Sequence, residues 1–181
     1  MAFNINEIRS GLALGGARPT LFRVELTNPI NTAADPIAPF LIQATSLPAS
    51  TIGQIEVPYF GRKIKVAGDR TFDAWQVVVM NDEDFKVRHS LELWHNSINN
   101  VLTNLNAGNT SAPARYKSTA LVTQYGKSGN TLRRYKFNGL FPIEISTIDL
   151  DWNSTDQIET FSATFAYDWY EVDAGETGRI Q

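Results

Sequence analysis

The stretch "GRKIKVAGDRTFDAWQVVVMNDEDF", residues 61–85, joins a basic run, a glycine, an apolar run and an acidic turn. Its centre, "WQVVVM" at residues 75–80, is rich in β-branched and aromatic side chains and has the length of one buried strand. The segment before it, from "SLPAST" to "VPYFGRKIKV", is polar and interrupted by proline. Its apolar residues Ile52, Ile55 and Val57 are too scattered to define a core face, so we expect a hairpin that projects from the body.

A helix should follow the acidic turn. Asn81 and Asp84 resemble a capping box, in which a side chain at the helix start and one three residues later satisfy free backbone donors. Apolar residues then recur at spacings of four and three, which places on one helical face the set Val87, Leu91, Trp94, Ile98 and Val101. This pattern predicts a helix that continues to about residue 104, and it is the only helix that the sequence predicts.

Most of the other apolar segments have the character of strands. "LFRVEL" and "FLIQAT" are extended patterns, and "STALVTQYG" and "TLRRYKFNG", joined by the turn "GKSGN", predict a β-hairpin. "TFSATFAYDWY", residues 160–170, alternates and predicts one strand whose inward face carries Phe161, Ala163, Phe165, Tyr167 and Trp169. The predicted fold is therefore mainly β.

The length and composition indicate one domain over residues 1–181, because 43% of the residues are hydrophobic and can form a sizeable core. Residues 1–19 lack periodicity and are expected to be an N-terminal arm. Residues 28–38 hold two prolines together with Asn and Asp, and they are expected to be a loop. Residues 172–181 show no core-forming pattern, which predicts a flexible C-terminal tail.

Charge and cysteine content exclude several classes of protein. The formal net charge of -3 disfavours a dedicated duplex-DNA binder, which must neutralise many phosphates. The chain has no cysteine, which removes disulfides, thiolate metal sites and cysteine nucleophiles and suits a reducing cytoplasm. No apolar run approaches the roughly 20 residues of a membrane span, so we expect no membrane anchor.

Charged residues are segregated along the second half of the chain. Between Leu93 and Ile143 there is no acid, and the bases are Arg115, Lys117, Lys127, Arg133, Arg134 and Lys136. From Glu144 to Glu176 there is no Lys or Arg, and the pattern inverts. Blocks of opposite sign suit complementary faces that dock one copy on another.

A calcium loop is the sharpest candidate for a chemical site. "DLDWNSTDQIET", from Asp149, offers oxygen ligands at loop positions one, three and five, which is the EF-hand spacing. Position six holds serine where glycine is required, and position twelve holds threonine where a glutamate is required. We expect instead a strand with Ile148, Leu150 and Trp152 directed inward and its carboxylates in water.

The remaining candidates for chemistry are weak. His89 and His95 lie six residues apart on the predicted helix and cannot form the i, i+4 pair that binds a metal. Arg133, Tyr135 and Phe137 interleave charge and aromatic rings as single-strand nucleic-acid binders do, but the acidic block that follows would repel phosphates. No nucleophile-elbow or phosphate-cradle motif is present, so we expect no catalytic residue, metal or cofactor.

One family does fit the opening stretch. "RKIKVAGDRTFDAWQVVVMNDE" resembles the central motif of tail tube proteins from contractile-tailed bacteriophages. Other landmarks of this family follow the same order: "ARPTLFRVEL", "ATSLPAS", "ARYKSTALVTQYG", "GLFPIEI" and "LDWNSTDQIETFSATFAYDWYE". They cover most of residues 17–171, whereas the 28–38 loop and the tail after Glu171 fit less well.

The resemblance implies a fold of two packed antiparallel β-sheets, sandwich or barrel-like, with one flanking α-helix, similar to the tube proteins of type VI secretion systems. It implies a structural subunit, not an enzyme, that assembles as stacked hexameric rings into a hollow tube inside a contractile sheath. Genomic DNA would pass through the lumen without sequence-specific binding. Such a subunit is made in the host cytoplasm and resides in the virion tail.

The same resemblance implies a set of partners: other copies of the chain, the tail sheath protein, the baseplate or tube initiator, and the tape measure protein. Three alternatives stay open. The chain is a tube initiator or baseplate-capping relative with the same fold, it is the tube subunit of a phage-derived contractile injection system, or it is a small enzyme or nucleic-acid module.

The hairpin would reach the next subunit or ring. The inter-subunit residues implied are Tyr59, Arg62, Lys63, Lys65, Asp69 and Arg70. Arg62, Lys63 and Lys65 would meet acids on a partner. Asp69 and Arg70 could pair locally and fix a turn after Gly68. The alternative for each is a solvated surface charge.

Overall fold

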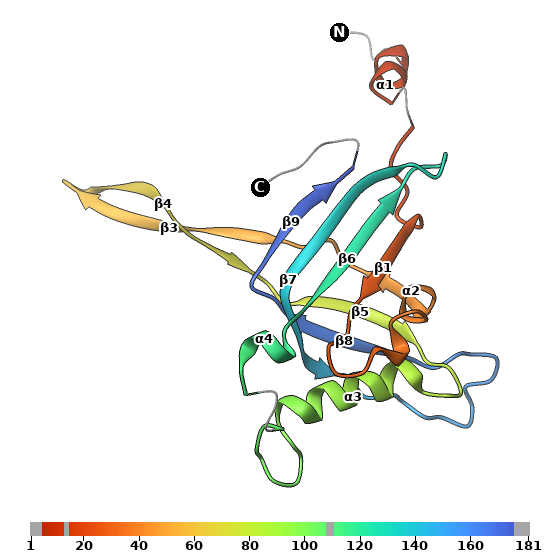
Figure 1. Cartoon of the computed structure of the whole chain (residues 1–181). Coiled ribbons are helices and arrows are strands. Elements are labelled where there is room, and N and C mark those ends of the chain that lie inside the picture. The colour runs from red at the N-terminus through yellow and green to blue at the C-terminus, as the bar shows by residue number, and fades with distance from the viewer. Residues whose placement is uncertain (1–4, 13–14, 108–110, 176–181) are drawn as a thin grey trace.

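The computed structural model describes residues 5–12, 15–107 and 111–175. It shows a β-sheet body from which one long hairpin projects to the side (Figure 1). The strands are β1 (Phe22–Leu26), β2 (Ile42–Thr45), β3 (Ser50–Tyr59), β4 (Arg62–Phe72), β5 (Trp75–Met80), β6 (Ser118–Tyr125), β7 (Thr131–Ile145), β8 (Thr160–Ala166) and β9 (Trp169–Ala174). The helices are α1 (Ile5–Gly11), the 3-10 helix η1 (Thr32–Ala34), α2 (Ala38–Leu41), α3 (Lys86–Ile98) and α4 (Pro113–Tyr116).

The long strand β7 belongs to two layers. Its first half pairs with β6 and β9, and its second half pairs with β8. One layer is therefore β1-β6-β7-β9 and the other is β7-β8-β5-β2, and every pairing is antiparallel. The predicted fold of two packed antiparallel sheets with a helix beside them is confirmed, with α3 below the sheets in Figure 1.

The bend between the layers lies at Gly139, whose φ of 70° is left-handed. The chain turns at the same level on the neighbouring strand, between β8 and β9, where Asp168 N donates to the Asn138 carbonyl at 2.9 Å. A Cβ on Gly139 would overlap the Asp168 carboxylate. Lys117 Nζ holds that carboxylate at 2.7 Å. We call this junction of Lys117, Asn138, Gly139 and Asp168 the corner.

The corner divides the single strand that the sequence predicts over residues 160–170. Phe161, Ala163 and Phe165 on β8 are buried, as predicted. Beyond the corner the alternation changes phase, because the residues between β8 and β9 are outside the ladder. Trp169 consequently points outward, contrary to the prediction.

The strand after the corner also reaches further than the sequence suggests. β9 continues to Ala174, and Val172 on it is buried. The predicted flexible tail from residue 172 is therefore wrong for residues 172–174, which pair with β7. Residues 176–181 lie outside the described part of the chain.

A chain of aromatic rings connects the two layers to α3. Trp75 on β5 stacks on Phe137 of β7, with ring centroids 4.5 Å apart. Phe165 on β8 contacts Trp75 at 5.6 Å on one side and Trp94 of α3 at 6.3 Å on the other. These four rings are fully buried, so they form the centre of the core.

Helix α3 presents the predicted face, and Val87, Leu91 and Trp94 are buried. Its start differs from the prediction, because Asn81 continues the sheet: its backbone N–H donates to the Glu159 carbonyl at 2.9 Å. The helix begins at Lys86, whose backbone N–H is accepted by Asp82 Oδ1. It ends at Ile98, which leaves the predicted face residue Val101 outside the helix and exposed.

Helices other than α3 correct the prediction of a single helix. α1 lies in the predicted N-terminal arm, and α2 takes the first two residues of the segment expected to be extended from Phe40. The 28–38 loop contains η1 and packs on α3, because the buried Asn28 donates to the Ser90 carbonyl at 2.9 Å. Asp35 accepts the Asn28 backbone N–H, and burial raises the pKa of Asp35 while this hydrogen bond opposes the shift.

Trp94→Ala tests the aromatic core. Trp94 is fully buried and donates through Nε1 to the Tyr116 carbonyl at 2.8 Å, so the substitution should lower the free energy of unfolding by about 3 to 5 kcal/mol. Trp152→Ala is the matched control, because Trp152 is fully exposed and its loss should change stability by less than about 0.5 kcal/mol. Equal denaturation midpoints for the two variants would contradict this core.

Gly139→Ala tests the corner. The substitution forces a side chain into left-handed backbone, at a cost of about 1–2 kcal/mol, and also displaces Asp168 from Lys117. Gly129→Ala is the control, because Gly129 has a similar φ of 79° but open space around it. Chemical denaturation should show a larger loss for Gly139→Ala, and equal losses would show that the corner tolerates a side chain.

Candidate functional site

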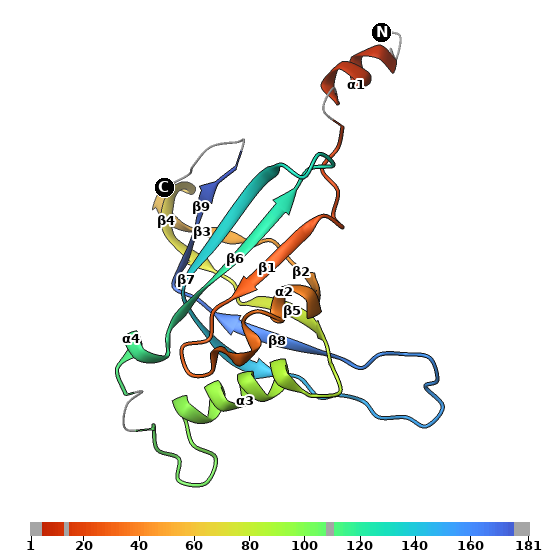
Figure 2. The ribbon, with the colours of Figure 1, turned by 45° about the vertical axis from the view of Figure 1, so that its right-hand side comes forward.

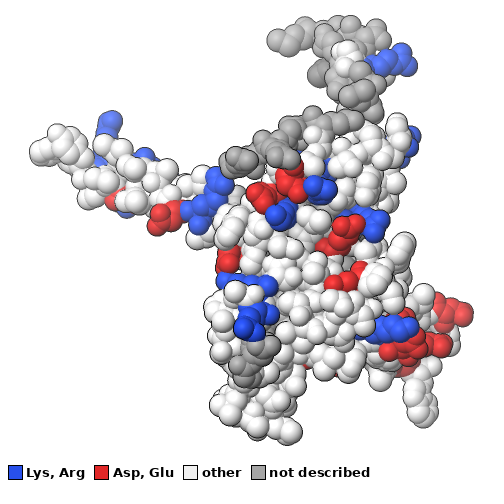
Figure 3. Space-filling model, in the orientation of Figure 1, with Lys and Arg blue, Asp and Glu red and all other residues white. Residues whose placement is uncertain are grey.

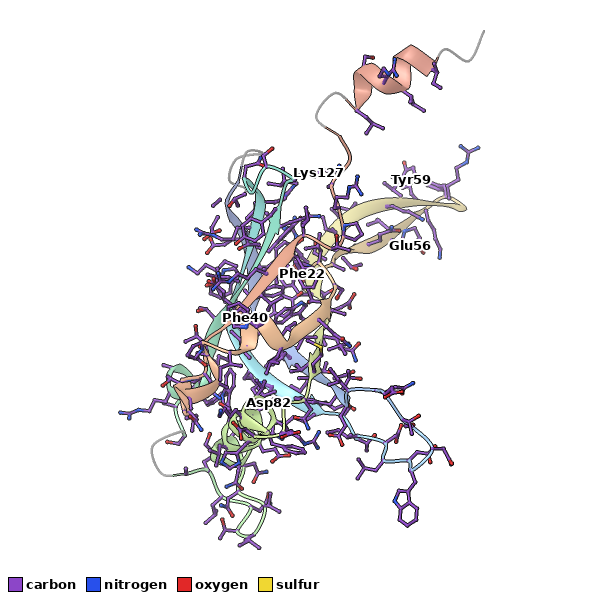
Figure 4. All side chains as sticks on the ribbon, turned by 90° about the vertical axis from the view of Figure 1, so that its right-hand side faces the viewer. Phe22, Phe40, Glu56, Tyr59, Asp82 and Lys127 are labelled. Carbon is purple, nitrogen blue, oxygen red and sulfur yellow. The ribbon has the colours of Figure 1, made fainter. Side chains whose placement is uncertain are left out.

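The most prominent surface is the projecting hairpin formed by β3 and β4, here called the arm. It extends the β2–β5 pair away from the body, with Glu56 and Tyr59 near its outer end (Figures 1 and 4). Phe60 and Gly61 form its two-residue turn, with φ of 42° and 79°, as the twist of a tight hairpin requires. The arm confirms the projecting hairpin that the sequence predicts.

Pairing between β3 and β4 separates the side chains of the arm by type. Ile55 lies opposite Val66 and Val57 opposite Ile64, whereas Glu56 lies opposite Lys65 on the other face. The apolar arm face, defined as Ile55, Val57, Tyr59, Ile64 and Val66, is 45–65% exposed at each residue. A contiguous apolar surface of this kind marks a contact with another protein.

Sequence reasoning missed this face because neither strand shows it alone. Ile55 and Val57 looked scattered until the register placed Ile64 and Val66 against them. The available signal was the alternation on both sides of the Phe-Gly turn, in "IEVPY" and "RKIKV". The arm is thus a two-faced ribbon, apolar on one side and charged on the other.

The predicted basic residues of the arm differ in their surroundings. Lys63 Nζ pairs with Glu56 of its own chain at 2.6 Å. Arg62 lies opposite Tyr59 beside the turn, and Lys65 lies opposite Glu56. Within the described part of the chain, neither Arg62 nor Lys65 forms an ion pair within 4.0 Å. Their contacts with another subunit stay a prediction.

The expected turn after Gly68 is wrong. Gly68 lies inside β4 at a bulge, where the register shifts between the pairs Ile52–Arg70 and Gln54–Ala67. A Cβ on Gly68 would lie 3.2 Å from the Gly53 carbonyl carbon, so two glycines let the strands approach closely. The described residues show no ion pair between Asp69 and Arg70, and the bulge takes the place of the expected turn.

Basic residues of the first charge block form ion pairs with acidic residues of the second block within the same chain. Because β9 lies beside β7, Arg134 Nε meets Asp173 at 2.7 Å and Lys136 Nζ meets Glu171 at 3.5 Å. The corner pair of Lys117 and Asp168 joins the same two blocks. These six residues thus form ion pairs within one chain, and docking of one copy on another through the charge blocks stays a prediction.

These pairs define a second surface on the outward side of β1, β6, β7 and β9. It carries three ion pairs: Arg23–Glu25 at 3.0 Å, Arg134–Asp173 and Lys136–Glu171. Figure 3 shows positive and negative side chains intermixed on this side of the body. The hydrogen bond that Arg134 donates to Asp173 is the main cause that raises the pKa of Arg134. We call this surface the ion-paired face.

The segment of residues 146–159 corrects another prediction. It forms a loop outside the sheets, seen at the right of Figure 2, and no strand. Ile148 packs partly on the core, but Leu150 and Trp152 point into solvent, so their predicted inward direction is wrong. Among the described residues, His, Asp and Glu side chains nowhere gather in threes as a metal site requires.

The other candidates for chemistry take structural positions. His89 is exposed and His95 half-buried on α3. Phe137 is fully buried, so the aromatic face suggested for nucleic acid is part of the core. Burial is the main cause that raises the pKa of Tyr167 to about 12, and its ring packs against Phe137. No helix in the described ranges is long and apolar enough to cross a membrane.

The profile of the family described as phage tail tube protein matches residues 17–173. The chain belongs to this family. The tail tube protein of Enterobacteria phage T4 is 38% identical over 156 residues, which cover 86% of this chain and 91% of that protein. The tail tube protein of Serratia phage KSP90 is 26% identical over 168 residues, which cover 90% and 93%. The resemblance seen in the opening stretch is confirmed.

Solved structures share the tail tube fold at low sequence identity. A chain in the cryo-EM structure of the anti-feeding prophage baseplate has a TM-score of 0.61 and 14% identity, covering 89% of this chain and 97% of that one. A chain in the sheath/tube terminator of the extracellular contractile injection system PVC has a TM-score of 0.60 and 16% identity, covering 88% and 97%. Tail tube proteins are structural components of the virion tail. This role agrees with a chain whose most prominent features are two surfaces, the arm and the ion-paired face.

Ile64→Glu tests the apolar arm face of this tail tube protein. Ile64 is more than half exposed in the single chain, so the free energy of unfolding should change by less than about 0.5 kcal/mol. Self-association should be lost, because a glutamate would be buried without a partner in a subunit contact. Leu150→Glu is the control, because Leu150 is an exposed apolar residue on the loop of residues 146–159, and this variant should associate as the native chain does. Normal association of Ile64→Glu, measured by sedimentation, would remove this face from the contact.

Proposed function

We propose that this chain is the repeating subunit of a hollow tail tube, in which hexameric rings stack inside a contractile sheath and genomic DNA passes through the lumen. Family membership supports the tube, and a fold neighbour is a chain of a sheath-tube complex in the extended state, with a TM-score of 0.56 and 15% identity. The observation that carries the ring is the pair of open edges on the layer that bears the ion-paired face.

The strands of this layer alternate in direction from β1 through β6 and β7 to β9. Among the described residues, β1 pairs only with β6, and β9 pairs only with β7. β1 of one copy would therefore run antiparallel to β9 of the next, and each pairing would close an edge that otherwise invites aggregation. Repetition around an axis gives a closed wall without edges, which is a heterologous ring contact.

The ion-paired face would then line the lumen. Its three cations and three anions cancel, and each charge is held by a neighbour of opposite sign. DNA binds proteins chiefly where unpaired Lys and Arg release counterions from its phosphates. A wall of balanced pairs offers no such gain, so it lets DNA move without sequence-specific binding.

The arm would contact a neighbouring copy through its apolar face, with Tyr59 and Arg62 at its end and Lys65 on its charged side. Asp69 and Arg70 lie at the bulge near its base, and they would set the angle at which the arm leaves the body. Proposed partners beyond other copies are the tail sheath protein, the baseplate or tube initiator, and the tape measure protein. The subunit would be made in the host cytoplasm, and it would need no metal or cofactor.

A tube initiator or baseplate-capping protein is the second candidate, since a fold neighbour belongs to a baseplate structure. That likeness has 14% identity, whereas the tail tube proteins of phages T4 and T6 are 38% and 37% identical over most of their length. The repeating subunit is therefore the better proposal. The tube of a phage-derived injection system would use the same surfaces.

Electron microscopy of the purified chain at high concentration tests the proposal. Rings or tubes with an open lumen are expected, and their formation should weaken with salt where exposed ion pairs contribute. Sedimentation as a monomer at every concentration and ionic strength, even with sheath and baseplate proteins added, would contradict the proposal. Arg62→Glu combined with Lys65→Glu should fold normally but assemble poorly, and normal tubes from this variant would return both residues to solvated surface charges.

A further inference from the structure

Helix α1 stands apart from the body and belongs to no surface described so far. Figures 1 and 2 both show it beyond one end of the β1-β6-β7-β9 layer. The family match begins at residue 17, after this helix. α1 has seven residues, and so short a helix is not stable in water without a surface to pack on.

One face of α1 is apolar and uncovered. Ile5, Ile8 and Leu12 follow one another at spacings of three and four, which places them on the same side. They are 57–79% exposed. Arg9 adds a positive charge in the last turn. The apolar face suits an apolar groove. The charge of Arg9 suits the C-terminal end of another helix, where the helix dipole is negative.

A groove with these properties lies at the opposite end of the body, beside the C-terminal end of α3. It has a volume of about 450 Å³, and its lining includes Ile98, Val101, Phe141, Pro142 and Ile143. The described lining also includes His95, Asn99, Asn100 and Asn104, and it contains no Asp, Glu, Lys or Arg. The carbonyl groups that end α3 carry partial negative charge.

The rim of this groove is a rigid loop that presents apolar side chains outward. The Asn100 side-chain oxygen accepts the backbone N–H groups of Leu102 and Thr103 at 2.9 and 3.1 Å, and the Asn100 backbone N–H donates to the Leu105 carbonyl at 3.0 Å. Val101 and Leu102 are nevertheless 87% and 93% exposed. A loop that is held in shape while it exposes two large apolar side chains is suited to a partner.

We propose that α1 of one copy docks in the α3-end groove of the copy stacked above or below it, so that α1 links successive rings. This inference rests on the proposed stacking of rings. The two surfaces lie at opposite ends of one chain and cannot meet within it (Figures 1 and 2). A contact between different surfaces of identical copies repeats without limit along an axis, as a tube requires. Ile5, Ile8 and Leu12 enter the groove, and Arg9 faces the last turn of α3.

Cysteine cross-linking tests the contact directly, because the native chain has no cysteine. Chains with both Ile8→Cys and Leu102→Cys should form a ladder of covalent multimers under copper-phenanthroline, visible on a non-reducing gel. A mixture of the two single variants should give only dimers. The control pair combines Leu102→Cys with Lys127→Cys, which lies at the same end of the body as α1 (Figure 4) and should give no ladder.

Two charge variants complete the test. Ile8→Glu and Leu102→Glu should each keep the native melting temperature and form single rings but few or no tubes, and Arg9→Gln should lower the tube yield to a smaller extent. Native-like tubes from both glutamate variants, or tubes without an Ile8–Leu102 cross-link, would overturn the α1 contact and leave the proposed tube intact. If the native chain forms no rings or tubes, the proposed function is contradicted instead. In that case the mixture of the two single cysteine variants tests the α1 contact by itself: covalent dimers support the contact, and their absence overturns it.

Discussion

The corner at Gly139 is the constraint on which the structure depends. β7 is long enough to serve both layers, but it can do so only if its backbone turns sharply without losing its neighbour. Gly139 supplies the left-handed turn, and the break between β8 and β9 at Asp168 follows it on the adjacent strand. Lys117 holds the Asp168 carboxylate in the space that a side chain on residue 139 would occupy. Both layers then face each other across Trp75 and Phe137.

The corner also decides which charges meet. By bringing β9 alongside the first half of β7, it places acids from the end of the chain against bases from its middle. Three of the resulting pairs neutralise charge inside one subunit, which leaves the outward side of the β1-β6-β7-β9 layer polar but balanced. In the proposed tube, a balanced wall would suit the passage of DNA better than either block of charge alone, because unpaired Lys and Arg would retain phosphates.

Within the described part of the chain, three exposed features have no intramolecular cover: the apolar arm face, the edges of the ion-paired layer, and α1. The arm points to one side of the body, the two edges lie on opposite sides of the layer, and α1 lies beyond one end (Figure 1). A monomer rarely keeps several contiguous apolar surfaces in water, since each favours association or aggregation. The chain belongs to the tail tube family, and in the proposed tube other copies of the chain would cover these surfaces.

The sequence by itself determined the elements whose signal is local. The β-branched run of β5, the buried face of α3 at Val87, Leu91 and Trp94, and the inward alternation of β8 are all set by side chains within one short segment. The family motif added the two-sheet fold and the expectation that the arm contacts another copy. Local patterns suffice there because helix and strand periods repeat within a few residues.

Only the tertiary structure decided what depends on pairing between distant segments. The outward turn of Trp169 and the burial of Val172 follow from the corner, which joins residues far apart in the chain. The apolar arm face appears only when β3 and β4 are in register. Asn81 does not begin α3, because its backbone N–H is bound to the carbonyl of Glu159, the residue before β8. A strand shifted by one residue shows its other face, so such outcomes are fixed by register and not by composition.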